Sequence, residues 1–155
     1  MGFQTHMLRT NFSEILIMET KQFLALKGFI VYKGKILIIK ESANYITSLN
    51  KGKYDVVGGK VKVGERFNEG LMKEIKEETG LTVTIGKPFS IQEWRPIING
   101  IENHIVGTFI ECFSNSDQVT LDRCFDNYLW IDPKSYKKYN LIDSVKLAFK
   151  DYISR

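Results

Sequence analysis

Short apolar runs and alternating apolar and polar positions mark much of this chain, and they predict β-strands. The predicted strands lie at residues 23–32, 36–39, 54–57, 82–85, 101–113 and 127–131. The first two flank the turn sequence Lys33-Gly34-Lys35, so we expect them to pair as a hairpin. We expect Gly107 to interrupt the strand over residues 101–113, because glycine weakens a strand interior.

Two segments repeat apolar residues at helical spacing instead. In residues 68–79, Leu71 and Ile75 lie on one side of a helix. Asn68 can cap the start of this helix, and Gly80 stands where a helix stop is expected. The segment therefore predicts an amphipathic helix with one face toward a core.

A second helical pattern lies near the end of the chain. Residues 141–153 carry an apolar residue at every fourth position, which predicts an amphipathic helix. The polar segment 41–53 predicts a loop. The resulting order of strands, one helix, more strands and one helix predicts an α+β fold, in which a mixed β-sheet carries helices on its faces.

The first twenty residues differ from the rest. Residues 1–20 contain the apolar stretch Ile15-Leu16-Ile17-Met18 but show no clear period. We therefore expect an N-terminal extension over residues 1–20, which is either a tag remnant or an extra strand that packs on the domain or on a partner. Residues 21–155 are expected to form one domain, since that length can bury a sizeable core.

Composition narrows the class of protein only modestly. Of the 155 residues, 43% are apolar and 26% charged, which is typical of a soluble globular protein. The net charge is +4, from 22 Lys and Arg against 18 Asp and Glu, and it favours an anionic partner only weakly. No apolar run reaches the ~18 residues of a membrane span. Cys112 and Cys124 match neither a metal-binding pair nor a disulfide framework, so we expect reduced thiols in a cytoplasmic protein.

Candidate chemistry is concentrated in and just before the first predicted helix. Glu74, Glu77 and Glu78 stand at i, i+3 and i+4, so their carboxylates project from one face. Clustered carboxylates suit a hard divalent cation such as Mg²⁺, which prefers oxygen ligands. Gly58 and Gly59 precede the helix through a loop, and their missing side chains let a ligand or metal approach the backbone closely.

The spacing of these residues resembles a known signature. The pattern runs Gly59, five residues, Glu65, seven residues, then Lys73-Glu74-Ile75-x-Glu77-Glu78-x-Gly80-Leu81. It resembles the signature of the Nudix hydrolases, which is G, x5, E, x7, R-E-U-x-E-E-x-G-U, where U is a bulky apolar residue. All specified positions match except Lys73, where the family has Arg. The resemblance implies an α/β/α sandwich with a mixed β-sheet.

The resemblance also implies a reaction and roles for the box residues. Nudix hydrolases split a pyrophosphate bond in a nucleoside diphosphate linked to another group, with Mg²⁺ or Mn²⁺ as the cofactor. By position, the implied metal ligands are Glu74, Glu77, Glu78 and a backbone carbonyl of Gly58 or Gly59. Glu74 or Glu77 is implied to orient or deprotonate the attacking water, and the choice between them is open.

Two further box residues have implied supporting roles. Glu65 would hold the loop or a metal-bound water. The family Arg orients the box glutamates, whereas Lys73 offers a point charge in place of a planar fork of donors. We therefore include Lys73 with the catalytic residues and expect weaker preorganisation of the site, with metal binding retained.

Substrate selection is expected to lie outside the box. Trp94 and Tyr45 can stack on a base, with core packing as the alternative. The other candidate substrate-binding residues are polar or charged, namely Lys60, Arg95, Asp122 and Asp126. Pro96 follows Leu81 at a spacing that resembles a marker of ADP-ribose-hydrolysing members.

Several functional hypotheses remain open on this sequence. The leading one is a MutT-like, Mg²⁺-dependent nucleotide pyrophosphohydrolase that acts on a small-molecule nucleoside di- or triphosphate derivative. The alternatives are an ADP-ribose or nucleotide-sugar pyrophosphatase and a Nudix module that binds a nucleotide without cleaving it. We expect no membrane partner and no stable nucleic-acid partner, and a homodimer is left open. The lysines between Lys27 and Lys62 are hypothesised to attract phosphates, with solvated strand-edge lysines as the alternative.

Overall fold

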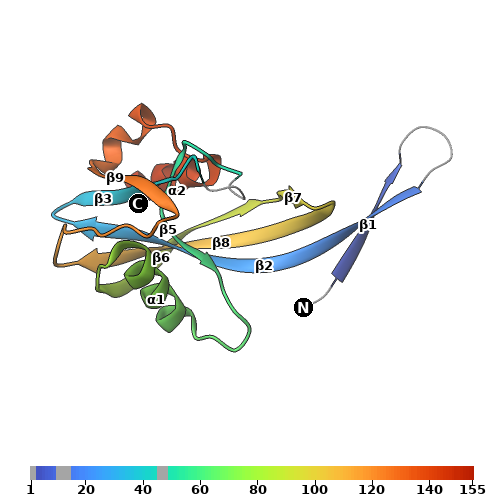
Figure 1. Ribbon diagram of the computed structural model, residues 1–155, viewed down its shortest axis with the longest axis horizontal. Helices are drawn as coiled ribbons and strands as arrows, with labels where there is room; N and C mark the ends of the chain where they lie inside the picture. Colours follow the sequence, from blue (N-terminus) through green and yellow to red (C-terminus); the bar gives the residue numbers. More distant parts are fainter. Residues whose placement is uncertain (1–2, 10–14, 45–48) are drawn as a thin grey trace.

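The computed structural model describes residues 3–9, 15–44 and 49–155, with side chains from Met18 onward. The described strands form one mixed sheet, and the two helices lie on opposite sides of it (Figure 1). The strands are β1 (Phe3–Arg9), β2 (Ile15–Tyr32), β3 (Lys35–Glu41), β4 (Tyr54–Asp55), β5 (Val57–Lys60), β6 (Val83–Trp94), β7 (Ile97–Ile98), β8 (Ile101–Ser114) and β9 (Phe125–Ile131). The helices are α1 (Phe67–Thr79), the short 3-10 helix η1 (Pro133–Lys138) and α2 (Asp143–Ile153). The expected α+β class with a mixed sheet is confirmed.

Strand β2 is the centre of the sheet. It pairs in parallel with β8 over Thr20–Val31 and antiparallel with β3, β5 and β1. Strand β8 pairs antiparallel with β6, and β3 pairs antiparallel with β9 and β4. Because β5 joins β2 at Ala25–Gly28, the glycines of the box lie beside the middle of the longest strand.

Two apolar layers hold the helices against the sheet. Under α2, Val145, Ala148 and Phe149 are fully buried against Phe29 and Phe109. Aromatic rings continue this layer, since the ring of Tyr136 in η1 stacks on that of Phe149 at 5.5 Å between centroids. This packing fixes α2 over one face of the sheet.

The second layer lies under α1. Leu71 and Ile75 are buried against the sheet together with Ile110 and Cys112. Gly28 makes the approach close, since a Cβ built there would lie 3.1 Å from Cδ1 of Ile75. The sheet therefore sets the position of the helix that carries the acidic residues.

At the ends of α1, the expected stop is confirmed and the expected cap is wrong. Gly80 ends the helix as expected, with a left-handed φ of 72° and its N–H bonded to the carbonyl of Lys76. The Asn68 cap is wrong, because the helix begins at Phe67 with Arg66 at the cap position and no side-chain cap bond. Phe67 is a large apolar residue that is exposed in the first turn, so the apolar pattern did not indicate that the helix starts there.

The strands after α1 are longer than expected. Strand β6 runs from Val83 to Trp94, well past the expected end at residue 85. Its pairing with β8 changes register between Ile85 and Pro88 and again between Pro88 and Ser90. Strand β8 passes through Gly107 without interruption, so the expected break there is wrong. The side chain of Trp94 occupies the space a residue 107 side chain would need, since a Cβ there would lie 2.4 Å from Cη2 of Trp94.

The N-terminal segment continues the sheet in the part the structure describes. Phe3–Arg9 runs antiparallel to Ile15–Lys21, and this pair extends away from the body of the molecule (Figure 1). β2 runs without a break from Ile15 into the domain. A domain boundary at residue 20 stays a prediction.

Candidate functional site

Of the three clustered glutamates on helix α1, two are half-buried against the body of the protein and one is exposed to solvent. Glu74 and Glu78 lie one turn apart and are half-buried. The side chain of Glu77 is 55% exposed, and its Oε1 lies 3.9 Å from Nζ of Lys73. Both members of that pair are exposed, so the pair contributes at most about 1 kcal/mol. Lys73 thus contacts a box glutamate, but loosely.

Glu78 is the most perturbed acid of the site. Burial, and next the charge of Glu74, raise the pKa of Glu78 to about 8. The backbone N–H of Gly58 donates a hydrogen bond to its carboxylate, and the charge of Lys27 also favours ionisation. Its Oε2 is buried without a hydrogen-bond partner among the described residues. A buried carboxylate oxygen left in this state is costly unless a cation or proton meets it.

The two glycines before α1 bring the backbone close to these acids. Gly58 has a φ of +141°, which favours glycine, and a Cβ there would lie 2.0 Å from the carbonyl oxygen of Leu26. At Gly59 a Cβ would lie 4.0 Å from the carboxyl carbon of Glu74. Any larger residue at Gly58 would push β5 away from β2, and the backbone donor to Glu78 would move with it.

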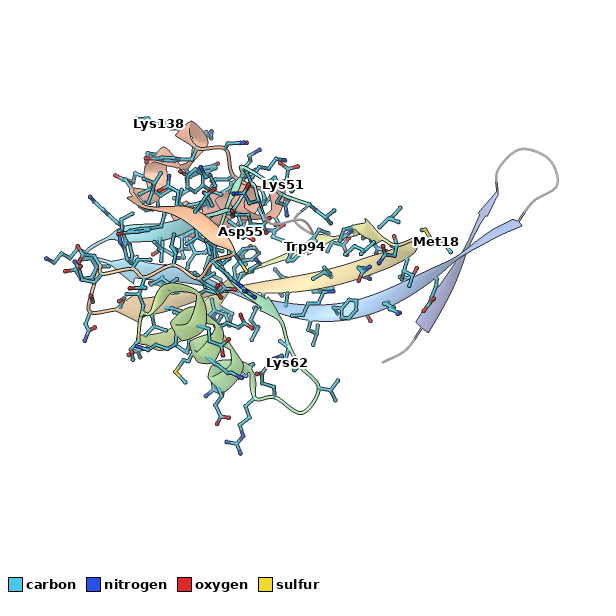
Figure 2. All side chains as sticks on the ribbon, in the orientation of Figure 1. Met18, Lys51, Asp55, Lys62, Trp94 and Lys138 are labelled. Atoms are coloured by element: carbon cyan, nitrogen blue, oxygen red, sulfur yellow. The ribbon has the colours of Figure 1, made fainter. Side chains whose placement is uncertain are left out.

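Glu65 ties the loop before α1 to the helix. Its Oε2 accepts a hydrogen bond from the N–H of Lys62 at 3.3 Å. The carboxyl group lies against Gly70, where a Cβ would be 2.6 Å from Cδ of Glu65. Glu65 therefore holds the loop on which Lys62 lies (Figure 2), and Gly70 supplies the space for it.

A buried cation that the sequence did not single out lies beside these acids. Nζ of Lys27 on β2 donates to Oδ2 of Asp55 at 2.7 Å, and both residues are only 8% exposed. The hypothesis that Lys27 is a surface lysine that attracts phosphates is therefore wrong for this residue. The only sequence signal for this contact was a lysine inside an otherwise apolar strand.

A pocket of about 230 Å³ opens where these groups meet. It is lined by Lys27, Glu41, Asp55, Val56, Gly58, Glu78, Asp122, Cys124 and Phe125. Its walls carry four acidic side chains and one basic one, so the pocket favours a cation. Burial, followed by the charge of Asp55, raises the pKa of Glu41, while the charge of Lys27 lowers it.

A larger groove of about 510 Å³ lies next to this pocket and shares Glu41 with it. Its apolar wall includes Trp94, Pro96, Ile98 and Leu147. Lys60 also lines the groove, with Nζ 3.7 Å from the ring centroid of Phe23, and burial lowers the pKa of Lys60. Trp94, labelled in Figure 2, lies over the sheet on the side of α2.

The remaining predicted substrate residues are dispersed. Tyr45 falls outside the described residues. Arg95 comes directly after the end of β6, and its guanidinium lies 3.6 Å from Glu102. It is absent from the residues that line either cavity. Asp122 lines the pocket. Asp126 lies 3.4 Å from Lys40 and is absent from the residues that line either cavity.

The arrangement places two box carboxylates, Glu74 and Glu78, side by side, while the metal-ligand role of Glu77 stays a prediction. Within the described ranges, no three His, Cys, Asp or Glu side chains converge as a set that could hold one ion. Glu74 and Glu78 lie together beside Gly58 and Gly59, while Glu77 points toward Lys73. Mg²⁺ commonly binds through one or two carboxylates plus water and substrate phosphates, so this pair suits such an ion.

Comparison with known proteins gives consistent matches. The sequence profile of the NUDIX domain matches residues 26–149. The nucleoside triphosphatase NudI of Klebsiella pneumoniae is 29% identical over 116 residues, which cover 70% of this chain and 81% of that protein. No helix in the described part of the chain is long and apolar enough to cross a membrane.

Solved structures share the same architecture. The MutT protein of Methanosarcina mazei has a TM-score of 0.74 at 23% identity, covering 87% of this chain and 95% of that chain. A MutT NUDIX hydrolase of Burkholderia pseudomallei has a TM-score of 0.71 at 20% identity, covering 84% and 98%. At these identities the likeness establishes the fold, and it confirms the mixed-sheet sandwich expected from the sequence.

Proposed function

We propose that this chain, which belongs to the NUDIX domain family and is a Nudix hydrolase, splits a pyrophosphate bond of a nucleoside triphosphate with the help of Mg²⁺. The observation that carries the proposal is the carboxylate corner made by Glu78, Glu74 and Gly58. Within it, Oε2 of Glu78 is buried and has no hydrogen-bond partner in the part of the chain that the structure describes. The nucleoside triphosphatase among the relatives supports the triphosphate as substrate.

The residues of this corner fit a divalent metal. Burial disfavours the charged form of Glu78 and raises its pKa to about 8, and a dication at this corner would compensate that charge and take the place of the proton. Glu74 and Glu78 would hold the ion, and the backbone at Gly58 or Gly59 would approach it closely. When bound, Mg²⁺ would neutralise charge on the phosphate oxygens and lower the pKa of the attacking water.

The protein groups around the corner have separate tasks in the proposed reaction. Water attacks a phosphorus atom, the bridging P–O bond breaks, and the proton of the water passes to a carboxylate. Glu74 suits this acceptor role better than Glu77, because Glu74 is half-buried beside Gly59 while Glu77 is exposed next to Lys73. The loop bond of Glu65 keeps Lys62 and the start of α1 in place.

The nucleoside is proposed to bind in the larger groove. It adjoins the carboxylate pocket at Glu41, so a ligand can reach both cavities at once. Trp94 and Ile98 offer apolar surface for a base, and base–aromatic stacking contributes about 1–3 kcal/mol. Lys60 at the groove can meet a phosphate oxygen. We therefore propose that the phosphates lie toward the pocket and the base toward Trp94.

A substrate panel tests the proposal. Nucleoside triphosphates, ADP-ribose and nucleotide sugars are incubated with and without Mg²⁺, and products are separated by chromatography. We expect Mg²⁺-dependent release of pyrophosphate or phosphate from at least one triphosphate. Faster turnover of ADP-ribose than of any triphosphate would replace the substrate assignment. Binding without turnover of any compound would favour a non-catalytic nucleotide-binding module.

A further inference from the structure

The buried ion pair of Lys27 and Asp55 has no part in the reaction as described so far. The distance between Nζ and Oδ2 is 2.7 Å, and the side chains are 10% and 12% exposed. Burying two charges costs several kcal/mol in desolvation, and a well-packed apolar pair is often as stable. Stability alone is therefore a weak explanation for this pair.

The geometry of Asp55 links the pair to the chain that enters the box. While Oδ2 of Asp55 accepts from Lys27, Oδ1 accepts from the backbone N–H of Val56 at 2.6 Å. The carboxylate thus joins the side chain of β2 to the backbone between β4 and β5. Gly58 lies two residues after Val56 and faces the same part of β2. A Cβ built on Gly58 would lie only 3.0 Å from Cα of Lys27.

The link continues from Gly58 to the acid of the site. The N–H of Gly58 donates to the carboxylate of Glu78. The chain of contacts is therefore Lys27, Asp55, the backbone of Val56–Gly58, and Glu78. The two contacts of Asp55 are short and buried, and Gly58 and Glu78 are half-buried. A displacement at Lys27 would therefore pass to the donor that orients Glu78.

The charges facing Lys27 are unbalanced. Four acidic side chains line the pocket from different elements: Glu41 from β3, Asp55 from β4, Glu78 from α1, and Asp122 from the segment before β9. Lys27 is the one cation in that lining among the described residues. An internal cation at this point draws carboxylates from β3, β4 and α1 toward one another.

We propose that Lys27 is a positioning residue, whose pairing with Asp55 holds Gly58 and, through it, Glu78 in the orientation that binds the metal. The inference deepens the proposed function and rests on it, because Mg²⁺ binding is what the pair would support. Lys27 touches neither the metal nor the reacting atoms in this account. Partners that orient a ligand in this way typically change metal affinity roughly 10- to 100-fold when removed.

The variant for the test is Lys27→Met/Asp55→Asn. It removes both charges together, so neither partner is left buried and ionised, and the net charge of the pocket is unchanged. The matched control is Lys21→Met/Glu19→Gln, which removes an exposed lysine–glutamate pair, 3.8 Å apart, from the same strand. Each protein is first checked for folding by its thermal unfolding.

Mg²⁺ affinity is measured by calorimetry on the full chain, and kcat and KM are measured separately. We expect Mg²⁺ to bind roughly tenfold or more weakly to the double variant, with a lower kcat at saturating metal and a substrate KM changed less than about threefold. The amide resonance of Gly58 should shift in the same variant. The control should match the wild type in all of these.

A folded double variant with wild-type Mg²⁺ affinity and an unshifted Gly58 amide would overturn the inference and leave the proposed function intact. If the wild type itself binds no Mg²⁺, the proposed function fails as well. Should the double variant not fold, Lys27→Met/Asp55→Leu repeats the test, because an apolar pair is often as stable as a buried ion pair. Wild-type Mg²⁺ affinity in that folded variant would also overturn the positioning role.

Discussion

Replacing Glu78 by glutamine is expected to stabilise the metal-free protein while it removes metal binding. The folded protein keeps Glu78 protonated up to a pKa of about 8, whereas the unfolded chain ionises it near 4.5. Between these values the folded state binds more protons than the unfolded state, so this group lowers stability as pH rises from about 4.5 to about 8. Glutamine has nearly the same shape and no such proton to lose.

The structure sets the size of the effect. At pH 7 the solution is about 2.5 pH units above the pKa of this carboxyl in the unfolded chain, and one unit corresponds to about 1.4 kcal/mol. Glu78 therefore lowers the free energy of unfolding by about 3 kcal/mol at this pH. Part of the expected gain in stability is lost, because the glutamine amide is half-buried and only its oxygen can accept the hydrogen bond from Gly58. We expect Glu78→Gln to raise the free energy of unfolding by about 1–3 kcal/mol at pH 7 and by close to nothing at pH 4.5.

The assay is denaturant unfolding in EDTA at pH 4.5, 6, 7 and 8, with thermal unfolding under the same conditions. A gain of 1 kcal/mol corresponds to a rise in Tm of roughly 2–4 °C for a chain of this length. Glu69→Gln is the matched control, because Glu69 lies on the same helix with its side chain 62% exposed. The control should change stability by no more than about 0.5 kcal/mol at any of these pH values.

Two results would refute the reasoning. One is a Glu78→Gln protein that is less stable than the wild type at pH 8 in EDTA. The other is a stability difference that does not change between pH 4.5 and pH 8. Either result would mean that burial of Glu78 does not oppose its ionisation. The argument that the corner of Glu78, Glu74 and Gly58 favours a bound cation would then lose its main support.

The remaining predictions concern the box and the groove. Lys73→Arg should hold or raise Mg²⁺ affinity, because guanidinium can pair with Glu77 through two donors; a clear fall measured by calorimetry would contradict this. Trp94→Ala should raise substrate KM roughly 5- to 100-fold with a smaller effect on kcat, which steady-state kinetics would show. Gly58→Ala should lower both Tm and Mg²⁺ affinity, since its Cβ would overlap the carbonyl oxygen of Leu26; an unchanged Tm would show that β5 can move aside.

The sequence predicted those helices and strands that depend on residues close together in the chain. The helix at α1 follows from apolar spacing and a glycine stop, and both are present in the structure. The hairpin of β2 and β3 follows from two apolar runs around Lys33-Gly34. The family resemblance implied that Gly58 or Gly59 lies near the box glutamates; in the structure Gly59 lies beside Glu74 and Gly58 beside Glu78, while their role at a metal stays a prediction.

Features that depend on long-range packing could not be predicted in this way. The expected break at Gly107 rested on glycine's weak strand propensity, but the ring of Trp94 fills that space and the strand continues. Lys27 was counted with the exposed lysines, because its partner Asp55 lies 28 residues away in sequence. Glu77 shares the helix face of Glu78 by spacing, yet only the packing of α1 decides which of them is buried.

Proton release on metal binding tests the central claim most directly. Mg²⁺ or Mn²⁺ is titrated into the wild type at pH 7 by calorimetry in two buffers of different ionisation enthalpy. If the ion binds at the corner of Glu78 and Glu74, about one proton should leave per ion, and Glu78→Gln should abolish both the release and most of the affinity. Metal binding without proton release, or equal binding by Glu78→Gln, would contradict the account.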